Sequence, residues 1–360
     1  MRISPLANTH SADADRTALS LGLRLSNDEV THLLREVYGL DVAVSSLDGD
    51  RDANYRVVAS TGAVMMFKVI HPDEHAETTR TQDALLTGLA DVAPHLPVPR
   101  IVRALDGSAS PMASTEQGCA FATRLVSFLD GVPIGSMTEG VWDPDGFGVS
   151  IGELMNAMAE LPPTKAAPLV WDLMQPRLAL ALAPSGAPQP GDSLAVSVLE
   201  RFAPSAPEAF ADLPWQPLHN DLNPGNVLVK AETGRTSAFI DFGDSVHGPR
   251  IGEVAVALSY LIDPDQEAER WDAVSTLRGI HRSCPLEPQE IDVLFELIAV
   301  RLAVTILVAH WRAARFPSNS EYITRNTDAA VRRLTALMAA RGTVTTRLFR
   351  AVTVEAGARL

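Results

Sequence analysis

The stretch 218-LHNDLNPGNVLV-229 places His219, Asp221 and Asn226 in one turn-rich segment that runs directly into an apolar stretch. Acidic and amide residues beside Pro224 and Gly225 are also what an ordinary surface turn contains. The segment alone therefore fits both a surface turn and a loop that performs chemistry, and residues elsewhere in the chain must decide between them.

A second acid, Asp241, follows twenty residues after Asp221, where the apolar stretch of "AFIDFGDSVHGP" (238–249) ends before Phe-Gly. Phosphoryl transfer from a nucleotide needs a base that orients the attacking hydroxyl, oxygen ligands for Mg²⁺ and a cation on the phosphates. Kinases supply the base and the metal ligands from an H-x-D-x-x-x-x-N loop and a later D-F-G acid. Either motif alone also occurs by chance. Their order and spacing predict a catalytic loop with Asp221 as base and with Asn226 and Asp241 as metal ligands.

Lys68 lies inside the apolar stretch "AVMMFKVI" (63–70), which is predicted to be a strand. A buried ammonium group needs a charged partner, and a nucleotide phosphate supplies one. The alternative is a lysine that extends from an edge strand into solvent. We expect an acid of the following helix to pair with Lys68, Glu77 in preference to Glu74.

The stretch "LDGDRDANYRV" (47–57) precedes this strand and is the candidate phosphate loop. It has a single glycine, Gly49, followed by polar residues able to form hydrogen bonds, and Asn54 and Tyr55 are further candidates for cofactor contact. The chain has no Walker motif and no dinucleotide-binding glycine fingerprint. It also has no hydrolase nucleophile elbow and no zinc-binding H-E-x-x-H helix.

The composition is that of a folded protein: 46% of the 360 residues are hydrophobic and 21% are charged. The net charge of −14 argues against nucleic acid as a partner. The two cysteines, Cys119 and Cys284, form no C-x-x-C pair, which argues against a disulfide framework. The polar N-terminus does not read as a signal peptide. The apolar stretch 297–311 carries Arg301 and is too short to span a bilayer, so it predicts a buried helix. We expect a soluble, cytoplasmic protein without a membrane partner.

Hydrophobic periodicity predicts an α+β fold. A polar segment, 1–25, precedes a helix that begins with Ser26 and Glu29 in capping-box spacing. Short strands and one or two helices follow up to about residue 126. The rest is mainly helical, with long helices at about 251–262, 288–314 and 326–341. The pattern predicts a β-rich N-lobe (26–123), a hinge (124–130) and a larger helical C-lobe (131–360), with the cleft between the lobes as the default ligand site.

The chain resembles the aminoglycoside phosphotransferase/choline kinase-like superfamily. Within it, the chain is most similar to hydroxylysine kinase-like proteins and to the kinase-like domain fused to some class III aminotransferases. The resemblance runs from about residue 40 to 325 and is carried by "LDGDRDANYRV", "MFKVI", "TRLVSFLDGVPI", "WDL", "LHNDLNPGNVLV", "IDFGDSVHGPRIGEVAVALSYLI" and "PSNSEYI". It implies a protein-kinase-like two-lobed fold. It also implies transfer of the γ-phosphate of ATP or GTP, with Mg²⁺, to a hydroxyl of an amine or amino-acid-like metabolite.

The resemblance also implies roles for single residues. Lys68 would contact the phosphates, and the backbone of "TRLVSFL", which includes Arg124 and Val126, would contact the nucleotide base. His219 is expected to support the catalytic loop by hydrogen bonds. One departure concerns Glu253, where such proteins often have an aspartate in the helix after D-F-G. This difference bears on how the loop is anchored or on the acceptor pocket.

The acceptor side is less specific in the sequence. Asp172 and Asp244 are candidates to receive an ammonium group, although both fit a solvated or capping acid equally well. Trp171, Trp311 and Tyr322 are more typical of packing than of an aromatic cage.

Two other functions fit parts of the pattern. One is an aminoglycoside-type antibiotic phosphotransferase, which the acidic net charge would suit. The other is a nucleotide-binding regulator without catalysis, against which the joint presence of Lys68, Asp221, Asn226 and Asp241 argues. The acceptor, the choice between ATP and GTP and the oligomeric state remain open at this stage.

Overall fold

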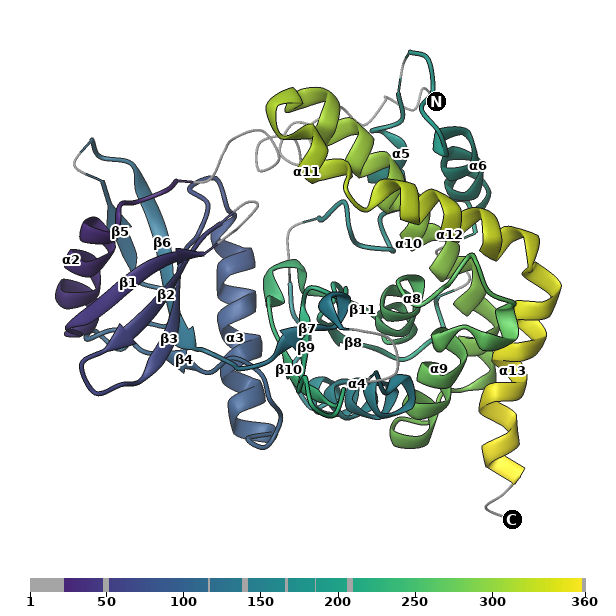
Figure 1. The fold of residues 1–360 in the computed structure, drawn as a ribbon, viewed down its shortest axis with the longest axis horizontal. Coiled ribbons are helices and arrows are strands. Elements are labelled where there is room, and N and C mark those ends of the chain that lie inside the picture. The colour runs from purple at the N-terminus through teal and green to yellow at the C-terminus, as the bar shows by residue number, and fades with distance from the viewer. Residues whose placement is uncertain are drawn as a thin grey trace, which may run out of the picture. The chain divides into compact units, whose positions relative to one another are not determined.

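The structure is a computed structural model that describes residues 23–47, 52–115, 117–137, 142–165, 168–184, 186–205 and 210–357 (Figure 1). Gly49 of the candidate phosphate loop lies outside the described residues, as do residues 1–22. The chain divides into two compact units. Unit 1 comprises residues 1–91 and 98–129, and unit 2 comprises residues 92–97 and 130–360.

Unit 1 is built around an antiparallel sheet with the strand order β1-β2-β3-β6-β4, and β5 also pairs with β6. The strands are β1 (Val42–Leu47), β2 (Ala53–Ala59), β3 (Val64–Val69), β4 (Ile101–Val102), β5 (Met112–Ser114) and β6 (Ala120–Ser127). Helices α2 (Asn27–Tyr38) and α3 (Ala76–Val92) complete the element list of this part of the chain.

The local sequence explains these elements. Strand β2 alternates strictly between buried and partly buried residues, which is the period of a strand with one face on a core. Helix α2 begins with the predicted capping box, in which the Ser26 side chain accepts from the Glu29 amide and the Glu29 carboxylate accepts from the Ser26 amide. Gly39 ends this helix with φ 69°, a left-handed conformation that glycine adopts without strain. Val30 and Leu34 of α2 are fully buried in the core of the unit.

Unit 2 is largely helical (Figure 1). Its helices are α4 (Pro144–Ala159), α5 (Pro176–Leu180), α6 (Asp192–Phe202), α8 (Ile251–Ser259), α9 (Asp272–Ser283), α10 (Pro288–Arg315), α11 (Ser320–Thr324), α12 (Thr327–Ala339) and α13 (Arg341–Gly357). The 3₁₀ turns are η1 (Ile134–Ser136), η2 (Phe242–Asp244), η3 (Ala268–Arg270) and η4 (Pro317–Asn319). The short strands are β7 (Val132–Pro133), β8 (Trp215–Leu218), β9 (Val227–Val229), β10 (Thr236–Phe239) and β11 (Val246–Pro249).

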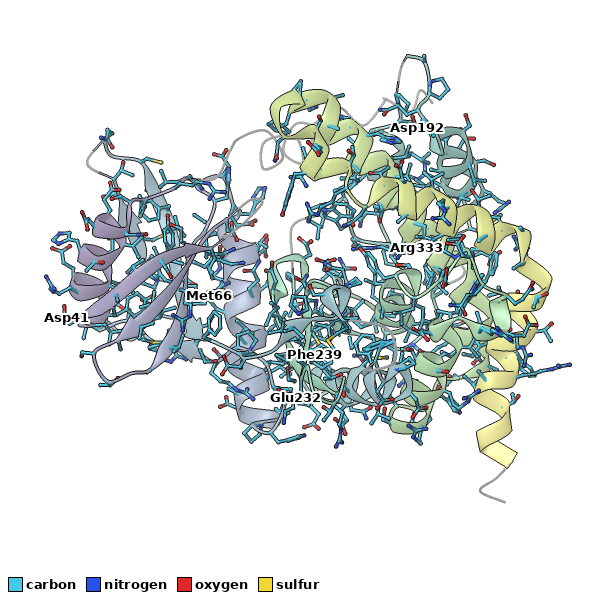
Figure 2. All side chains as sticks on the ribbon, viewed as in Figure 1. Asp41, Met66, Asp192, Glu232, Phe239 and Arg333 are labelled. Carbon is cyan, nitrogen blue, oxygen red and sulfur yellow. The ribbon has the colours of Figure 1, made fainter. Side chains whose placement is uncertain are left out.

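Helix α10 is the central helix of unit 2 and packs against α6, α8 and α12. Most of its length is buried, which confirms the buried helix predicted for residues 297–311. Phe239 of β10, labelled in Figure 2, is also fully buried. Helix α13 was not predicted. None of the described helices combines the length and apolar character that a membrane crossing requires.

The predicted α+β class is confirmed, with an antiparallel N-terminal sheet and a largely helical C-terminal part. The expected boundaries of the N-lobe, hinge and C-lobe stay predictions. Residues 124–127 of the expected hinge belong to strand β6, and unit 1 ends at Leu129. The short segment 92–97 belongs to unit 2, although it comes before Leu129 in the sequence.

Candidate active site

Strand pairing in unit 2 brings the two predicted motifs together. Leu218 of β8 pairs with Val246 of β11, and Val227 of β9 pairs with Phe239 of β10. The loops 219–226 and 240–245 are therefore held against each other at both ends. The Ile240 amide also donates to the Asn226 carbonyl at 2.9 Å. Residues separated by about twenty positions in the sequence thus share one site.

Both loops contain a strained residue. Asn220 (φ 66°) and Asp241 (φ 61°) are the non-glycine residues with positive φ in the part of the chain that the structure describes. A left-handed conformation of this kind costs on the order of 1–3 kcal/mol and persists only where the surroundings enforce it. Such strain is typical of functional sites, and here it falls on the predicted catalytic loop and on the predicted metal ligand.

Glu253 of α8 enforces the conformation of the catalytic loop. Its Oε2 accepts from the His219 amide at 2.5 Å, and its Oε1 accepts from the Asn220 amide at 3.1 Å. The side chain is 1% exposed, and this burial raises its pKa to about 7, whereas the two backbone amides lower it. Glu253 therefore supplies a carboxylate that anchors the loop, although the resemblance leads us to expect an aspartate at this position.

His219 joins the two loops. Its Nε2 donates to the Ile240 carbonyl at 2.9 Å, and its Nδ1 accepts from the Asp221 amide at 3.2 Å. The ring packs on Phe242 with 4.5 Å between the ring centroids. Burial lowers the pKa of His219, and the two hydrogen bonds require the neutral tautomer with the proton on Nε2.

The Asp221 carboxylate is held by three side chains. Its Oδ2 accepts from Asn226 Nδ2 at 2.7 Å and from Asn223 Nδ2 at 2.9 Å, and its Oδ1 accepts from Arg301 Nη2 at 2.9 Å. Burial raises the pKa of Asp221, while the Arg301 charge lowers it. The charge of Asp241 also raises this pKa, because the two carboxylates are near each other. A partly buried carboxylate whose hydrogen-bond donors are fixed can act as a base toward one acceptor hydroxyl.

The residues predicted as metal ligands fit a magnesium ion. Both donated hydrogen bonds of the Asn226 amide nitrogen go to Asp221, so the amide oxygen faces the other way. Asp241 is exposed at the neighbouring loop. The described residues contain no group of three or more His, Cys, Asp or Glu that could hold a metal by themselves. Two side-chain oxygens match Mg²⁺, which takes one or two protein ligands and completes its shell with phosphate oxygens and water.

Arg301 is a site residue that the sequence analysis missed. It lies on α10 with 2% exposure, and its Nη2 also donates to Tyr260 Oη at 3.3 Å. The Trp171 ring covers the guanidinium at 5.1 Å, and the Trp171 carbonyl accepts from Nη1 at 3.5 Å. The signal in the sequence was a lone arginine in the apolar stretch 297–311, because a buried charge needs a partner.

In unit 1, Lys68 of β3 is largely buried, with Nζ 3.3 Å from Asp52 Oδ2. Glu77, the acid expected beside Lys68, is exposed in the first turn of α3. Glu74 lies in the turn before α3 and not on the helix. Asn54 is the cross-strand neighbour of Lys68, and its buried Oδ1 has no hydrogen-bond partner among the described residues.

Three residues expected at the cofactor have buried side chains in unit 1. Tyr55 is 2% exposed, and its hydroxyl bonds to the backbone of Leu25, so its side chain is a core residue and not a ligand contact. Arg124 of β6 forms a buried ion pair with Asp83 of α3 at 2.7 Å. Val126 is buried in β6 between β3 and β4. The contact expected of Arg124 and Val126 is made by their backbone, and it stays a prediction.

The acceptor candidates lie beside this network. Asp172 directly follows Trp171, and its Oδ1 accepts from the Met174 amide at 2.8 Å. Burial raises the pKa of Asp172 to about 6. Asp244 ends η2, and its carbonyl accepts from Asn220 Nδ2 at 3.0 Å. Arg301 therefore links the segment that carries Asp172 to the Asp221 carboxylate.

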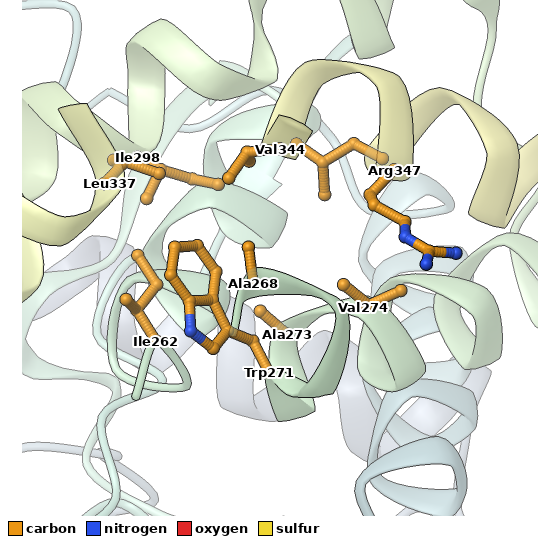
Figure 3. A pocket seen from close by; sticks show the side chains of 10 residues that line it. Ile262, Ala268, Trp271, Ala273, Val274, Ile298, Leu337, Val344 and Arg347 are labelled. Atoms are coloured by element: carbon orange, nitrogen blue, oxygen red, sulfur yellow. The ribbon is translucent and has the colours of Figure 1, made fainter. Parts of the chain in front are cut away.

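The aromatic residues farther along the chain are engaged in cation–π contacts. Arg315 lies over Trp311 at 4.2 Å, and Arg325 lies over Tyr322 at 3.6 Å. An apolar pocket of unit 2, lined by Trp271, Ile298, Arg347 and their neighbours, contains none of the predicted site residues (Figure 3).

Comparison with known proteins identifies the family of this chain. Residues 43–286 match the family described as "Phosphotransferase enzyme family". Hydroxylysine kinase of Danio rerio is 24% identical over 337 residues, covering 87% of this chain and 91% of that protein. Hydroxylysine kinase of Bos taurus is 22% identical over 340 residues, covering 87% and 89%.

Solved structures share the fold. The microcompartment-associated aminopropanol kinase matches with a TM-score of 0.69 and 16% identity, covering 90% of this chain and all of that one. The choline kinase of Streptococcus pneumoniae matches with a TM-score of 0.58 and 11% identity, covering 86% and 99%. An amicoumacin kinase matches with a TM-score of 0.62 and 15% identity, covering 85% and 94%. With its family match spanning more than half of its length and its two kinase motifs joined in one site, this chain belongs to the phosphotransferase enzyme family and is a small-molecule kinase that uses an alcohol group as acceptor.

Proposed function

We propose that the chain transfers the γ-phosphate of ATP or GTP, with Mg²⁺, to a hydroxyl of a small amine or amino-acid-like metabolite. The observation that carries the proposal is the Asp221 carboxylate, which is fixed by Asn226 and Arg301 beside Asp241. Such a carboxylate can orient an acceptor hydroxyl and accept its proton.

The chemical step uses few protein groups. The acceptor O–H proton passes to Asp221 as the acceptor oxygen forms a bond to the γ-phosphorus. The bond from phosphorus to the bridging oxygen breaks, and the nucleoside diphosphate leaves with its electron pair. Asn226 and Asp241 would hold Mg²⁺, which when bound offsets the charge of the phosphates. Lys68, partly neutralised by Asp52, would contact a phosphate oxygen.

A cationic acceptor is supported by two acids, Asp172 and Asp244, on segments that contact Arg301 or the predicted catalytic loop. Asp172 is ionised at neutral pH, because its pKa of about 6 lies below 7. It belongs to the segment that Arg301 links to Asp221. The hydroxylysine kinases similar to this chain act, by name, on a hydroxylated amino acid, and the aminopropanol kinase of similar fold acts on an amino alcohol. We propose the same acceptor class here, with Asp172 and Asp244 facing the ammonium group.

The test is a phosphate-transfer screen with the purified protein, Mg²⁺ and either ATP or GTP. The acceptor panel contains hydroxylysine, aminopropanol, choline and other hydroxy-amines beside kanamycin-type aminoglycosides and spectinomycin. Product mass identifies the phosphorylated compound. Asp221→Asn serves as the inactive control, and Asp265→Asn, at an exposed surface ion pair with Arg332, serves as the matched active control.

We expect the highest kcat/KM with a hydroxy-amine or hydroxy-amino acid. A preference for an aminoglycoside would instead support the antibiotic phosphotransferase, which the net charge of −14 also suits. Equal rates for Asp221→Asn and the wild type would refute the assignment of the base.

A further inference from the structure

Arg301 has a position that packing alone does not explain. It lies between fully or nearly fully buried residues, Val300 and Leu302, on the central helix of unit 2, and is itself 2% exposed. Removing a guanidinium from water costs several kcal/mol before its partners compensate. A leucine or methionine would fill the same space without this cost, so the charge itself requires a reason.

The contacts of Arg301 converge on the base. Its Nη2 lies 2.9 Å from Asp221 Oδ1 and 3.3 Å from Tyr260 Oη. Trp171 covers the guanidinium and accepts from Nη1 through its carbonyl. In the described part of the chain, Arg301 Nε has no hydrogen-bond partner. The ionic contact of the side chain is therefore directed at one oxygen of Asp221, and Trp171 and Tyr260 restrict its rotation.

Counting lone pairs distinguishes the two carboxylate oxygens. Each oxygen of an ionised carboxylate accepts about two hydrogen bonds. Oδ2 already accepts from Asn223 and Asn226, whereas Oδ1 accepts from Arg301. Oδ1 therefore has one remaining acceptor position, and Arg301 defines the direction in which that position points.

We infer that Asp221 Oδ1 is the atom that receives the acceptor proton, and that Arg301 is the positioning residue that aims it. This inference rests on the proposed function. The hydroxyl proton goes to Oδ1, the hydroxyl oxygen bonds to the γ-phosphorus, and the leaving diphosphate takes the electrons of the broken phosphorus–oxygen bond. Arg301 keeps its protons throughout and does not contact the acceptor.

The same geometry assigns Arg301 a second, structural connection. Because it holds Trp171 as well as Asp221, it couples the base to the segment that carries Asp172. A displaced guanidinium would shift the base relative to the acceptor candidates on that segment. Displacements of about 1 Å in such constellations cost on the order of 10²-fold in rate.

The experiment compares Arg301→Met and Arg301→Lys with the wild type, using the acceptor that the wild type phosphorylates best. We expect kcat to fall about 10–10²-fold in Arg301→Met, with the KM for the nucleotide nearly unchanged. Arg301→Lys keeps the charge but loses the planar fork, so it should recover part of the lost kcat. Glu290→Gln, on the same helix as Arg301, disturbs the ion pair of Glu290 with Arg250; it is the matched control and should keep kcat.

A double-mutant cycle separates positioning from a general loss of structure. If Arg301 acts through Asp221, Arg301→Met should add little to the loss already caused by Asp221→Asn. If the kcat losses of the two single variants multiply in the double variant, the inference is wrong. It is also wrong if Arg301→Met keeps the wild-type kcat. If Arg301→Met does not fold, the same comparison with Arg301→Lys decides: an unchanged kcat contradicts the positioning role. A wild-type protein that transfers no phosphate to any acceptor would instead refute the proposed function.

Discussion

At the scale of single residues, the site depends on carboxylates whose surroundings differ. Asp221 is held by Asn223, Asn226 and Arg301, whereas Glu253 is held by backbone amides of the catalytic loop. In the proposed mechanism Asp221 faces the reacting atoms. Glu253 stabilises the strained loop that carries Asp221. Substitutions at the two positions should therefore have different signatures.

Asp221→Asn keeps the shape of the side chain and removes the base. We expect kcat to fall by about 10²–10⁴-fold, because this is the usual contribution of a general base. Nucleotide binding should persist, so the loss belongs to the chemical step, and single-turnover phosphate transfer measures it. Transfer within a few-fold of the wild-type rate would place the base elsewhere.

Glu253 predicts a pH dependence of stability. Burial raises its pKa to about 7 in the folded protein, above the ordinary value of 4.5. The native state then binds the proton more tightly, so this group makes folding less favourable as the pH rises from about 4.5 to about 7. In Glu253→Gln, the free energy of unfolding should change less between pH 4.5 and pH 7 than in the wild type. Urea unfolding at pH 5 and pH 8 measures this free energy. If the difference between the two pH values is the same in the variant and in the wild type, the assignment to Glu253 is wrong.

Asp172 predicts a pH dependence of acceptor binding. Because its pKa is raised to about 6, the carboxylate is ionised above that pH and neutral below it. The KM for a cationic acceptor should therefore rise as the pH falls below about 6, while the KM for the nucleotide should not follow. Asp172→Asn should raise the acceptor KM and remove this dependence. A parallel pH response of the variant and the wild type would exclude Asp172 from the acceptor site.

At the scale of elements, short strand pairs and a close helix contact organise unit 2. The pairs β8–β11 and β9–β10 bring the two kinase motifs together. Helices α4 and α9 approach closely through glycines, and a Cβ on Gly148 would lie 2.0 Å from the Thr276 carbonyl oxygen. This distance requires one of the two helices to move.

Gly148→Ala should therefore destabilise the protein, by about 1–3 kcal/mol, which is typical of an overpacked contact. Gly342 provides the matched control, because a Cβ there meets nothing within 4 Å and the residue lies in helix α13. Gly342→Ala should leave stability unchanged or raise it slightly, since alanine favours a helix. Denaturant midpoints of the two variants measure the contrast, and equal midpoints would show that α4 and α9 tolerate the added methyl group.

At the scale of the whole molecule, each unit carries a residue predicted to serve the nucleotide, Lys68 on unit 1 and Asp241 on unit 2. Asp241→Ala should abolish metal-dependent nucleotide binding or turnover, because it removes one of two proposed magnesium ligands. Lys68→Met should mainly weaken productive placement of the phosphates. Calorimetry with ATP, with and without Mg²⁺, tests both. Unchanged Mg²⁺–ATP affinity together with unchanged turnover in Asp241→Ala would defeat the metal assignment.

The sequence by itself determined the α+β class, the central buried helix and the phosphotransferase family, because these depend on local periodicity and on short motifs with fixed spacing. The same motifs single out Asp221, Asn226 and Asp241, whose roles stay predictions. Glu253 and its helix were also visible, although the target of its carboxylate was not.

Only the tertiary structure decided which side chains meet. Arg301 is eighty positions from Asp221, and no local pattern indicates that α10 directs it at the base. Likewise no local pattern indicates that Asp52 lies beside Lys68 or that Tyr55 belongs to the core. A periodic pattern shows which face of an element is buried, but the partner of a buried charge depends on how distant elements pack against one another.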